Sequence, residues 1–156
     1  MARDATARLY DVDADGVQLD TTKGEITFRA KKGRLVDLDK LHESIWATRL
    51  SGGTGMGLNW LDVTAMGNAL GDREQTRFQV AGTNQYFVLE DDPKTKGAAG
   101  AKSPLVRLRE ALDRGEKVAS VTGRVIGWTG HFPPFLRALP AKPRRIMVKD
   151  FQIAQK

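Results

Sequence analysis

Three aspartates at alternate positions near the N-terminus could bind a metal ion. In "DVDADG", residues 11–16, Asp11, Asp13 and Asp15 are followed by a glycine and match the first half of a calcium-binding loop. The second half does not match, because Thr22 stands where such a loop places a bidentate glutamate. Asp-Gly between alternating runs is also a strong hairpin signal. We therefore favour a turn and keep calcium binding as the alternative.

The glycine-rich segment "SGGTGMGLNW", residues 51–60, could be a phosphate-binding loop. Such a loop needs the order strand, glycines, helix, because the free N–H groups at a helix N-terminus must face the anion. Here a predicted helix precedes the glycines and a predicted strand follows them. The Gly-Lys-Ser/Thr ending of a P-loop is also absent. We interpret the segment as a helix stop and a crossover, and we expect no nucleotide cofactor.

Other residue types that support catalysis or metal binding are sparse. The chain has no cysteine, and neither of its two histidines, His42 and His131, has a His or Cys partner at ligand spacing. No pair of carboxylates lies in an apolar setting that would separate their pKa values for acid–base work. We therefore expect no enzymatic activity.

Basic residues gather in the C-terminal third. The net charge is −2 over residues 1–101 and +8 over residues 102–156, which together give the overall +6. Basic grooves with aromatic platforms bind single-stranded nucleic acid. We favour a solvated basic face and keep a nucleic-acid groove as the alternative. The candidate residues for that groove are Arg124, Lys142, Arg144, Arg145 and Lys149.

Length and composition limit the class of protein. A chain of 156 residues supports one domain or two small ones, and its 40% hydrophobic and 28% charged residues are typical of a globular protein. No apolar run approaches the ~20 residues that cross a bilayer. The first residues, "MARDATARLY", do not resemble a signal peptide. We expect a cytoplasmic protein from this chain alone, or a periplasmic or exported one if an upstream signal was removed.

The hydrophobic periodicity of the first half predicts a β-meander and a helix. "GVQLD" and the alternating "EITFRAK" predict two strands joined by "TTKG". In "DLDKLHESIWATRL", Leu38, Leu41 and Ile45 predict one apolar stripe of a helix that Asp37 caps. The alternation in "LNWLDVTAM" then predicts a further strand.

The second half predicts mostly strands. "RFQVAGTNQYFVLED" predicts a hairpin that turns at "AGTN". Ser103 is expected to cap a helix with Pro104 at its first position, Leu105, Leu108 and Leu112 on its buried face and Gly115 at its end. "KVASVTGRVIGW", with a bulge or close backbone approach at Gly123, and "RRIMVKDFQIA" predict the last strands.

Two resemblances follow from this order of elements. Residues 16–66, which include "GVQLDTTKGEITFRAKKGRLVDLDKLHESIWATRL", resemble the second half of a heavy-metal-associated domain, a ferredoxin-like fold of metal chaperones. The Cys-x-x-Cys motif of that family has no counterpart here, so the resemblance implies no ligand positions. Residues 71–156 resemble, more loosely, a small OB-like barrel.

The expected fold class is α+β. A β-meander with one helix, a degenerate ferredoxin-like half over residues 1–70, precedes a small OB-like β-barrel with one helix over residues 71–156. The expected function is a non-catalytic binding or accessory module that contacts another protein. The alternatives are nucleic-acid binding through the basic C-terminal region and an exported module stabilised by calcium.

The hairpin interpretation of residues 11–16 predicts that millimolar calcium leaves thermal stability unchanged. Replacing Asp11, Asp13 and Asp15 together by Asn is expected to alter the melting temperature little, because exposed turn charges contribute weakly. A calcium site would instead add about 2.7 kcal/mol at a hundredfold excess of ligand over its Kd. A melting temperature that rises by several degrees in calcium, but not in magnesium, would overturn the turn interpretation.

Overall fold

The protein is α+β, as the sequence predicts, and consists of two compact units. The computed structural model describes Thr6 and residues 17–29, 37–47, 60–71, 74–92, 101–126 and 144–155. One unit comprises Met1–Asn59 and Thr129–Leu139, and the other comprises Trp60–Trp128 and Pro140–Lys156. The predicted aspartate turn at residues 11–16 lies outside the described residues.

The first unit contains a short hairpin. Strands β1 (Gln18–Asp20) and β2 (Glu25–Thr27) pair in antiparallel fashion. The turn between them forms because the Asp20 carboxylate accepts hydrogen bonds from the backbone N–H groups of Thr22 and Lys23, at 3.0 and 3.1 Å. Gly24 follows with a φ of 66°, which a residue with a side chain adopts only under strain.

Helix α2 (Leu38–Ala47) is the second element of this unit. Asp37 caps it as the sequence predicts, because its carboxylate accepts a hydrogen bond of 3.0 Å from the backbone N–H of Lys40. Leu41 and Ile45 lie one turn apart and are both buried, with 2% and 6% of their surface exposed. The predicted apolar stripe is confirmed at these two positions.

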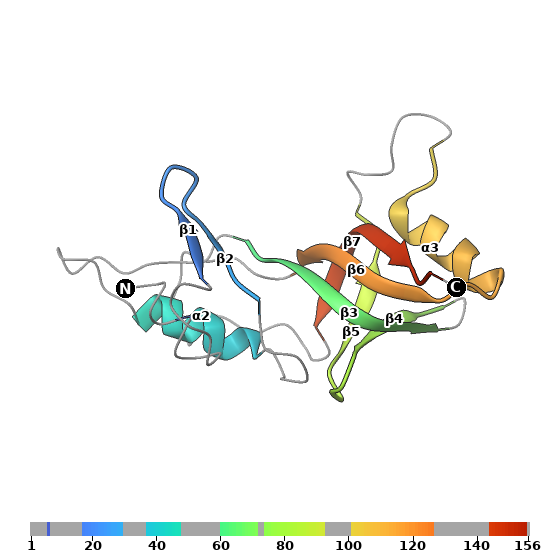
Figure 1. Ribbon diagram of the computed structural model, residues 1–156, viewed down its shortest axis with the longest axis horizontal. Helices are drawn as coiled ribbons and strands as arrows, with labels where there is room; N and C mark the ends of the chain where they lie inside the picture. The colour runs from blue at the N-terminus through green and yellow to red at the C-terminus, as the bar shows by residue number, and fades with distance from the viewer. Residues whose placement is uncertain are drawn as a thin grey trace. The chain divides into compact units, whose positions relative to one another are not determined.

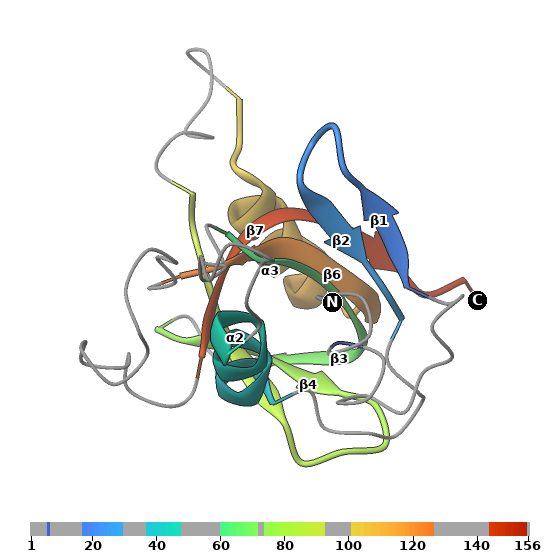
Figure 2. The same ribbon diagram turned by 90° about the vertical axis from the view of Figure 1, so that its left-hand side faces the viewer.

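The second unit is a closed five-stranded barrel with one helix (Figure 1). The order around the barrel is β3-β4-β5-β7-β6, and every neighbouring pair is antiparallel except β5 and β7. Figure 2 shows these strands curving around a common centre. Their bounds are Asp62–Gly71 for β3, Thr76–Val80 for β4, Tyr86–Glu90 for β5, Val118–Val125 for β6 and Arg145–Ile153 for β7, with α3 (Pro104–Asp113) between β5 and β6.

The long strand β3 closes the barrel by pairing with a different neighbour along each half. Asp62–Met66 pair with β6, and Gly67–Gly71 pair with β4. Gly67 stands where the partner changes, and a Cβ at this position would overlap the backbone carbonyl of Gln79. A glycine is needed here because the two backbones approach too closely for any side chain.

Helix α3 packs on the barrel through β6 and β7. Ser103 caps it by accepting a hydrogen bond from the Val106 N–H, Pro104 holds its first position, and Gly115 follows its end with a φ of 78°. Leu105 and Leu108 are buried as predicted. Leu112 is only half-buried, because Ala111 occupies the core position at this turn of the helix.

The boundary between the units differs from the division at residue 70 that the sequence suggests. The second compact unit begins at Trp60, because all of β3 pairs with strands of the barrel. The apolar alternation of residues 61–65 is as predicted, with Ala65 buried. The alternation predicts a strand but does not indicate its partners, which are β6 and β4.

Gly67→Ala is expected to destabilise the barrel by about 1–3 kcal/mol, the usual cost of forcing extra atoms into a packed structure. The reason is the overlap of the new Cβ with backbone atoms, which cannot move aside as a flexible side chain can. Denaturant unfolding measures this change, with the exposed neighbour Asn68→Ala as the matched control. Equal stability of the two variants would contradict the close approach of β3 and β4 at Gly67.

Candidate functional site

One outward face of the barrel combines exposed apolar side chains with an arginine and two amides. The face spans β3 from Met66 to Leu70 together with β4 and β5, and cross-strand pairing joins Asn68 to Gln79 and Gln79 to Tyr86. Met66, Leu70 and Tyr86 have 60%, 56% and 36% of their surface exposed. We name this surface the Tyr86 face and define it by Met66, Asn68, Leu70, Arg77, Gln79 and Tyr86.

The composition of the Tyr86 face is that of a protein interface. Tyrosine, methionine and arginine are enriched in interface cores, whereas lysine, glutamate and aspartate are depleted. The six residues of the face include the first three types and none of the last three. Asn68 separates Met66 from Leu70 along β3, and Gln79 lies between Asn68 and Tyr86, so exposed apolar side chains alternate with amides across the face.

Contacts within the Tyr86 face hold its polar side chains in place. The Arg77 guanidinium lies 5.3 Å from the centroid of the Tyr86 ring, and its Nε donates a hydrogen bond of 2.8 Å to the Gln75 side chain. Gln79 donates a hydrogen bond of 3.2 Å to the backbone carbonyl of Thr83 in the β4–β5 turn. These side chains are therefore arranged before any partner arrives, which lowers the entropy lost on binding.

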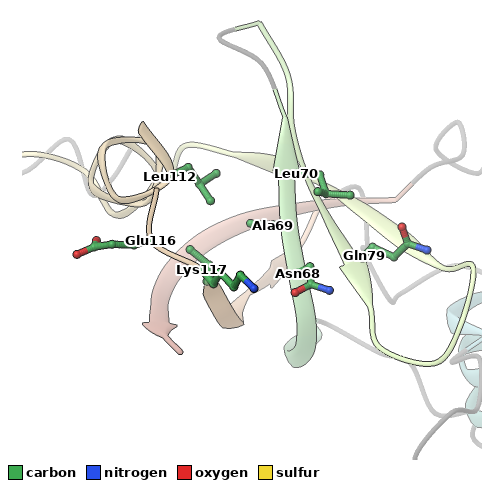
Figure 3. Close-up of a pocket in the computed structure, with 8 residues that line it drawn as sticks. Asn68, Ala69, Leu70, Gln79, Leu112, Glu116 and Lys117 are labelled. Atoms are coloured by element: carbon green, nitrogen blue, oxygen red, sulfur yellow. The ribbon is translucent and has the colours of Figure 1, made fainter. Parts of the chain in front are cut away.

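A hollow of about 260 Å³ adjoins the Tyr86 face. It lies where β3 has left β6, and its lining residues come from β3, β4 and the segment that leads from α3 into β6 (Figure 3). Leu70 and Leu112 supply apolar surface, and Glu116 and Lys117 add opposite charges. The hollow is open to solvent on one side, and its lining combines apolar and polar groups.

A second group of side chains lies on the outward side of β3, β6 and β7. The Asp62 carboxylate accepts two hydrogen bonds from Arg124, at 2.8 and 3.1 Å, and one of 3.0 Å from Lys149. The Arg124 guanidinium lies 4.7 Å from the centroid of the Trp60 ring, which is 41% exposed. We name this group the Trp60 cluster and define it by Trp60, Asp62, Thr64, Thr122, Arg124 and Lys149.

Electrostatics inside the Trp60 cluster stabilise its charged forms. Burial alone would raise the pKa of Asp62, but the hydrogen bonds and charges of Arg124 and Lys149 outweigh it and hold that pKa below its ordinary value of 3.8. The hydrogen bond to Asp62 raises the pKa of Arg124 despite its partial desolvation, and Asp62 and Asp92 add charge attraction. Asp62 and Arg124 therefore stabilise each other's charged form at neutral pH.

The structure brings together only part of the predicted nucleic-acid set. Arg124 and Lys149 meet at Asp62, whereas Arg145 forms an ion pair of 2.7 Å with Glu90 of β5. Arg144 is buried, with 8% of its surface exposed, and cannot line an open groove. Lys142 lies outside the described residues.

The two surfaces contain residues that the sequence analysis did not select. Trp60, Asp62 and Thr64 occupy the even-numbered positions, which lie on the outward side of β3 and its N-terminal extension. The hydroxyl groups of Thr64 and Thr122 lie 2.9 Å apart across the β3–β6 pair, although 58 positions separate them in the chain. Strand parity could have indicated which residues face outward, but not which strands lie side by side.

Comparison with known proteins adds no family assignment: no family model matches the chain, and neither curated proteins nor solved structures give a match. The described residues include no helix that is long and apolar enough to span a membrane. The same part of the chain contains no group of three or more His, Cys, Asp or Glu residues that could hold a metal ion.

Asp62→Asn is expected to destabilise the protein at neutral pH by less than about 1 kcal/mol, as is usual for a partly exposed ion pair. Because the folded-state pKa of Asp62 is lowered, its contribution is fully present above the unfolded value near 3.8 and is lost as the pH falls through the lower folded value. Unfolding free energies of the wild type and the variant should therefore converge below that pH. A difference that persists unchanged into strong acid would contradict this account of the cluster.

Proposed function

We propose that the protein is a non-catalytic binding module that holds another protein on the Tyr86 face and in the adjoining hollow. The observation that carries this proposal is the joint exposure of Met66, Leu70 and Tyr86 on one face of the barrel. Exposing these side chains to water is unfavourable unless a partner covers them for part of the time. Their position on paired strands gives the surface a fixed shape.

The strand order supports an OB-type barrel, which is the second part of the proposal. OB folds are five-stranded Greek-key barrels in which the face of the second and third strands binds ligands. The second and third strands of this barrel are β4 and β5, which supply Arg77, Gln79 and Tyr86. The fold alone does not name the ligand, so the class of partner is inferred from the side chains.

The side chains of the Tyr86 face indicate the chemistry of the partner. Arg77 is the single charged member of the face and is placed to pair with a carboxylate. The hollow beside Leu70 accepts an apolar anchor, because Leu70 and Leu112 line it. The partner we propose therefore presents a large apolar residue close to an aspartate or a glutamate.

The basic C-terminal third does not carry the proposal, because many of its charges are already paired. Arg145 pairs with Glu90, Arg114 pairs with Glu116 at 2.8 Å, and Lys102 pairs with Glu110. A protein that binds nucleic acid through a broad basic groove needs cations that are free to replace counterions. Calcium binding near the N-terminus stays a separate prediction, because its aspartates lie outside the described residues.

A photo-crosslinking amino acid at position 70 is expected to trap a discrete protein adduct in cells that produce the full chain. Tyr86→Ala in the same chain is expected to weaken the complex by about 2 kcal/mol or more, the range for an aromatic hot spot. The adduct band should therefore fall strongly in this second variant.

The matched control places the crosslinker at Val106, an exposed apolar position of α3 with 37% of its surface exposed. No adduct of the same mass is expected from that position. An adduct that forms equally from both positions, or that is insensitive to Tyr86→Ala, would contradict the proposed interface. Retention of the wild-type melting temperature by Tyr86→Ala establishes that the fold is intact.

A further inference from the structure

The Trp60 cluster has properties that the stability of the barrel does not require. One carboxylate, Asp62, is shared by two cations, Arg124 and Lys149, so that the cluster contains more positive than negative groups. Their side chains are about one-third exposed, and ion pairs of this kind contribute little to stability. The exposed indole of Trp60 stands beside them rather than in the core.

We propose that the Trp60 cluster binds a single-stranded nucleic acid, with one base on the Trp60 ring and a backbone phosphate on Arg124 and Lys149. The Arg124 guanidinium lies over one face of the ring, and the base stacks on the opposite face. Stacking on an aromatic ring tolerates every base, because each base has a π-face. This site uses β3, β6 and β7 and is independent of the Tyr86 face.

Asp62 holds the position that the phosphate takes. Its two oxygens accept the paired N–H groups of Arg124, and a guanidinium fork binds a phosphate in the same bidentate way. Lys149 closes the other side of the carboxylate at 3.0 Å. Binding therefore exchanges one anion for another on the same two cations, and Asp62 limits the affinity of the site.

The neighbouring hydroxyl groups complete the site. Thr64 and Thr122 lie on the same outward side of β3 and β6, two residues along from Asp62 and Arg124 respectively. Their hydroxyls hydrogen-bond to each other at 2.9 Å and can each turn to a phosphate or sugar oxygen. The cluster thus offers one aromatic platform, two cations and two hydroxyl donors within one patch.

Fluorescence anisotropy with a labelled oligothymidylate and an abasic strand of equal length tests this site in the full chain. Asp62→Asn is expected to bind the oligothymidylate more tightly than the wild type, with a salt slope steeper by about 0.7, because no displaced carboxylate then offsets the counterion that the phosphate releases. Trp60→Leu is expected to lose about tenfold in affinity for oligothymidylate and little for the abasic strand. Trp60→Phe should retain most of the stacking and so show that the aromatic ring is what binds.

Two variants, one in α3 and one at the residue that follows it, control for overall charge and folding. Glu110→Gln removes a paired carboxylate as Asp62→Asn does, and Arg114→Gln removes a paired cation far from the cluster in the chain. A general charge effect would give Glu110→Gln the same gain as Asp62→Asn and would overturn the proposal. Absence of binding by Asp62→Asn, an equal loss on the abasic strand, or a loss with Tyr86→Ala instead of Trp60→Leu would overturn it as well.

Discussion

The pairing of β3 with β6 and then with β4 is the constraint on which the rest of the barrel depends. Its first half, Asp62–Met66, has β6 as its neighbour, and its second half, Gly67–Gly71, has β4. Gly67 allows the backbone of β4 to approach where the partner changes. The barrel closes because β3 pairs with β6 along one half and with β4 along the other. Closure removes the exposed strand edges that favour aggregation.

The same change of pairing partner along β3 determines where the two candidate surfaces lie. The first half of β3 presents Asp62 and Thr64 to the Trp60 cluster, and the second half presents Asn68 and Leu70 to the Tyr86 face. Because β3 leaves β6 after Met66, a hollow remains between its second half and the start of β6. One strand therefore supplies residues to a charged surface at one end and to an apolar surface at the other.

Local pattern predicted much of the fold and little of the site. Features that neighbouring residues determine could be predicted from the sequence. They are the caps at Asp37 and Ser103, the hairpin of β4 and β5, and the end of α3 at Gly115. The candidate surfaces depend on contacts between residues far apart in the chain. The ion pair of Asp62 with Lys149 spans 87 positions, and neither residue has a local signal that identifies the other.

The basic charge of the C-terminal third illustrates the same limit. The alternative to a solvated basic face is a groove of five cations, but pairing with Asp62 and Glu90 and the burial of Arg144 divide the described ones among different environments. The acidic partners belong to β3 and β5, which precede that third of the chain. Charge counted by segment does not reveal such neutralisation, because it arises only when the strands are assembled.

Native-state amide hydrogen exchange along β3 tests the central claim most directly. If one continuous strand closes the barrel and carries both surfaces, the hydrogen-bonded amides of Asp62–Met66 and Gly67–Gly71 should open with one shared free energy, equal to that of β6 and β7. Opening of Gly67–Gly71 at a much lower free energy, while Asp62–Met66 stays protected, would contradict the account.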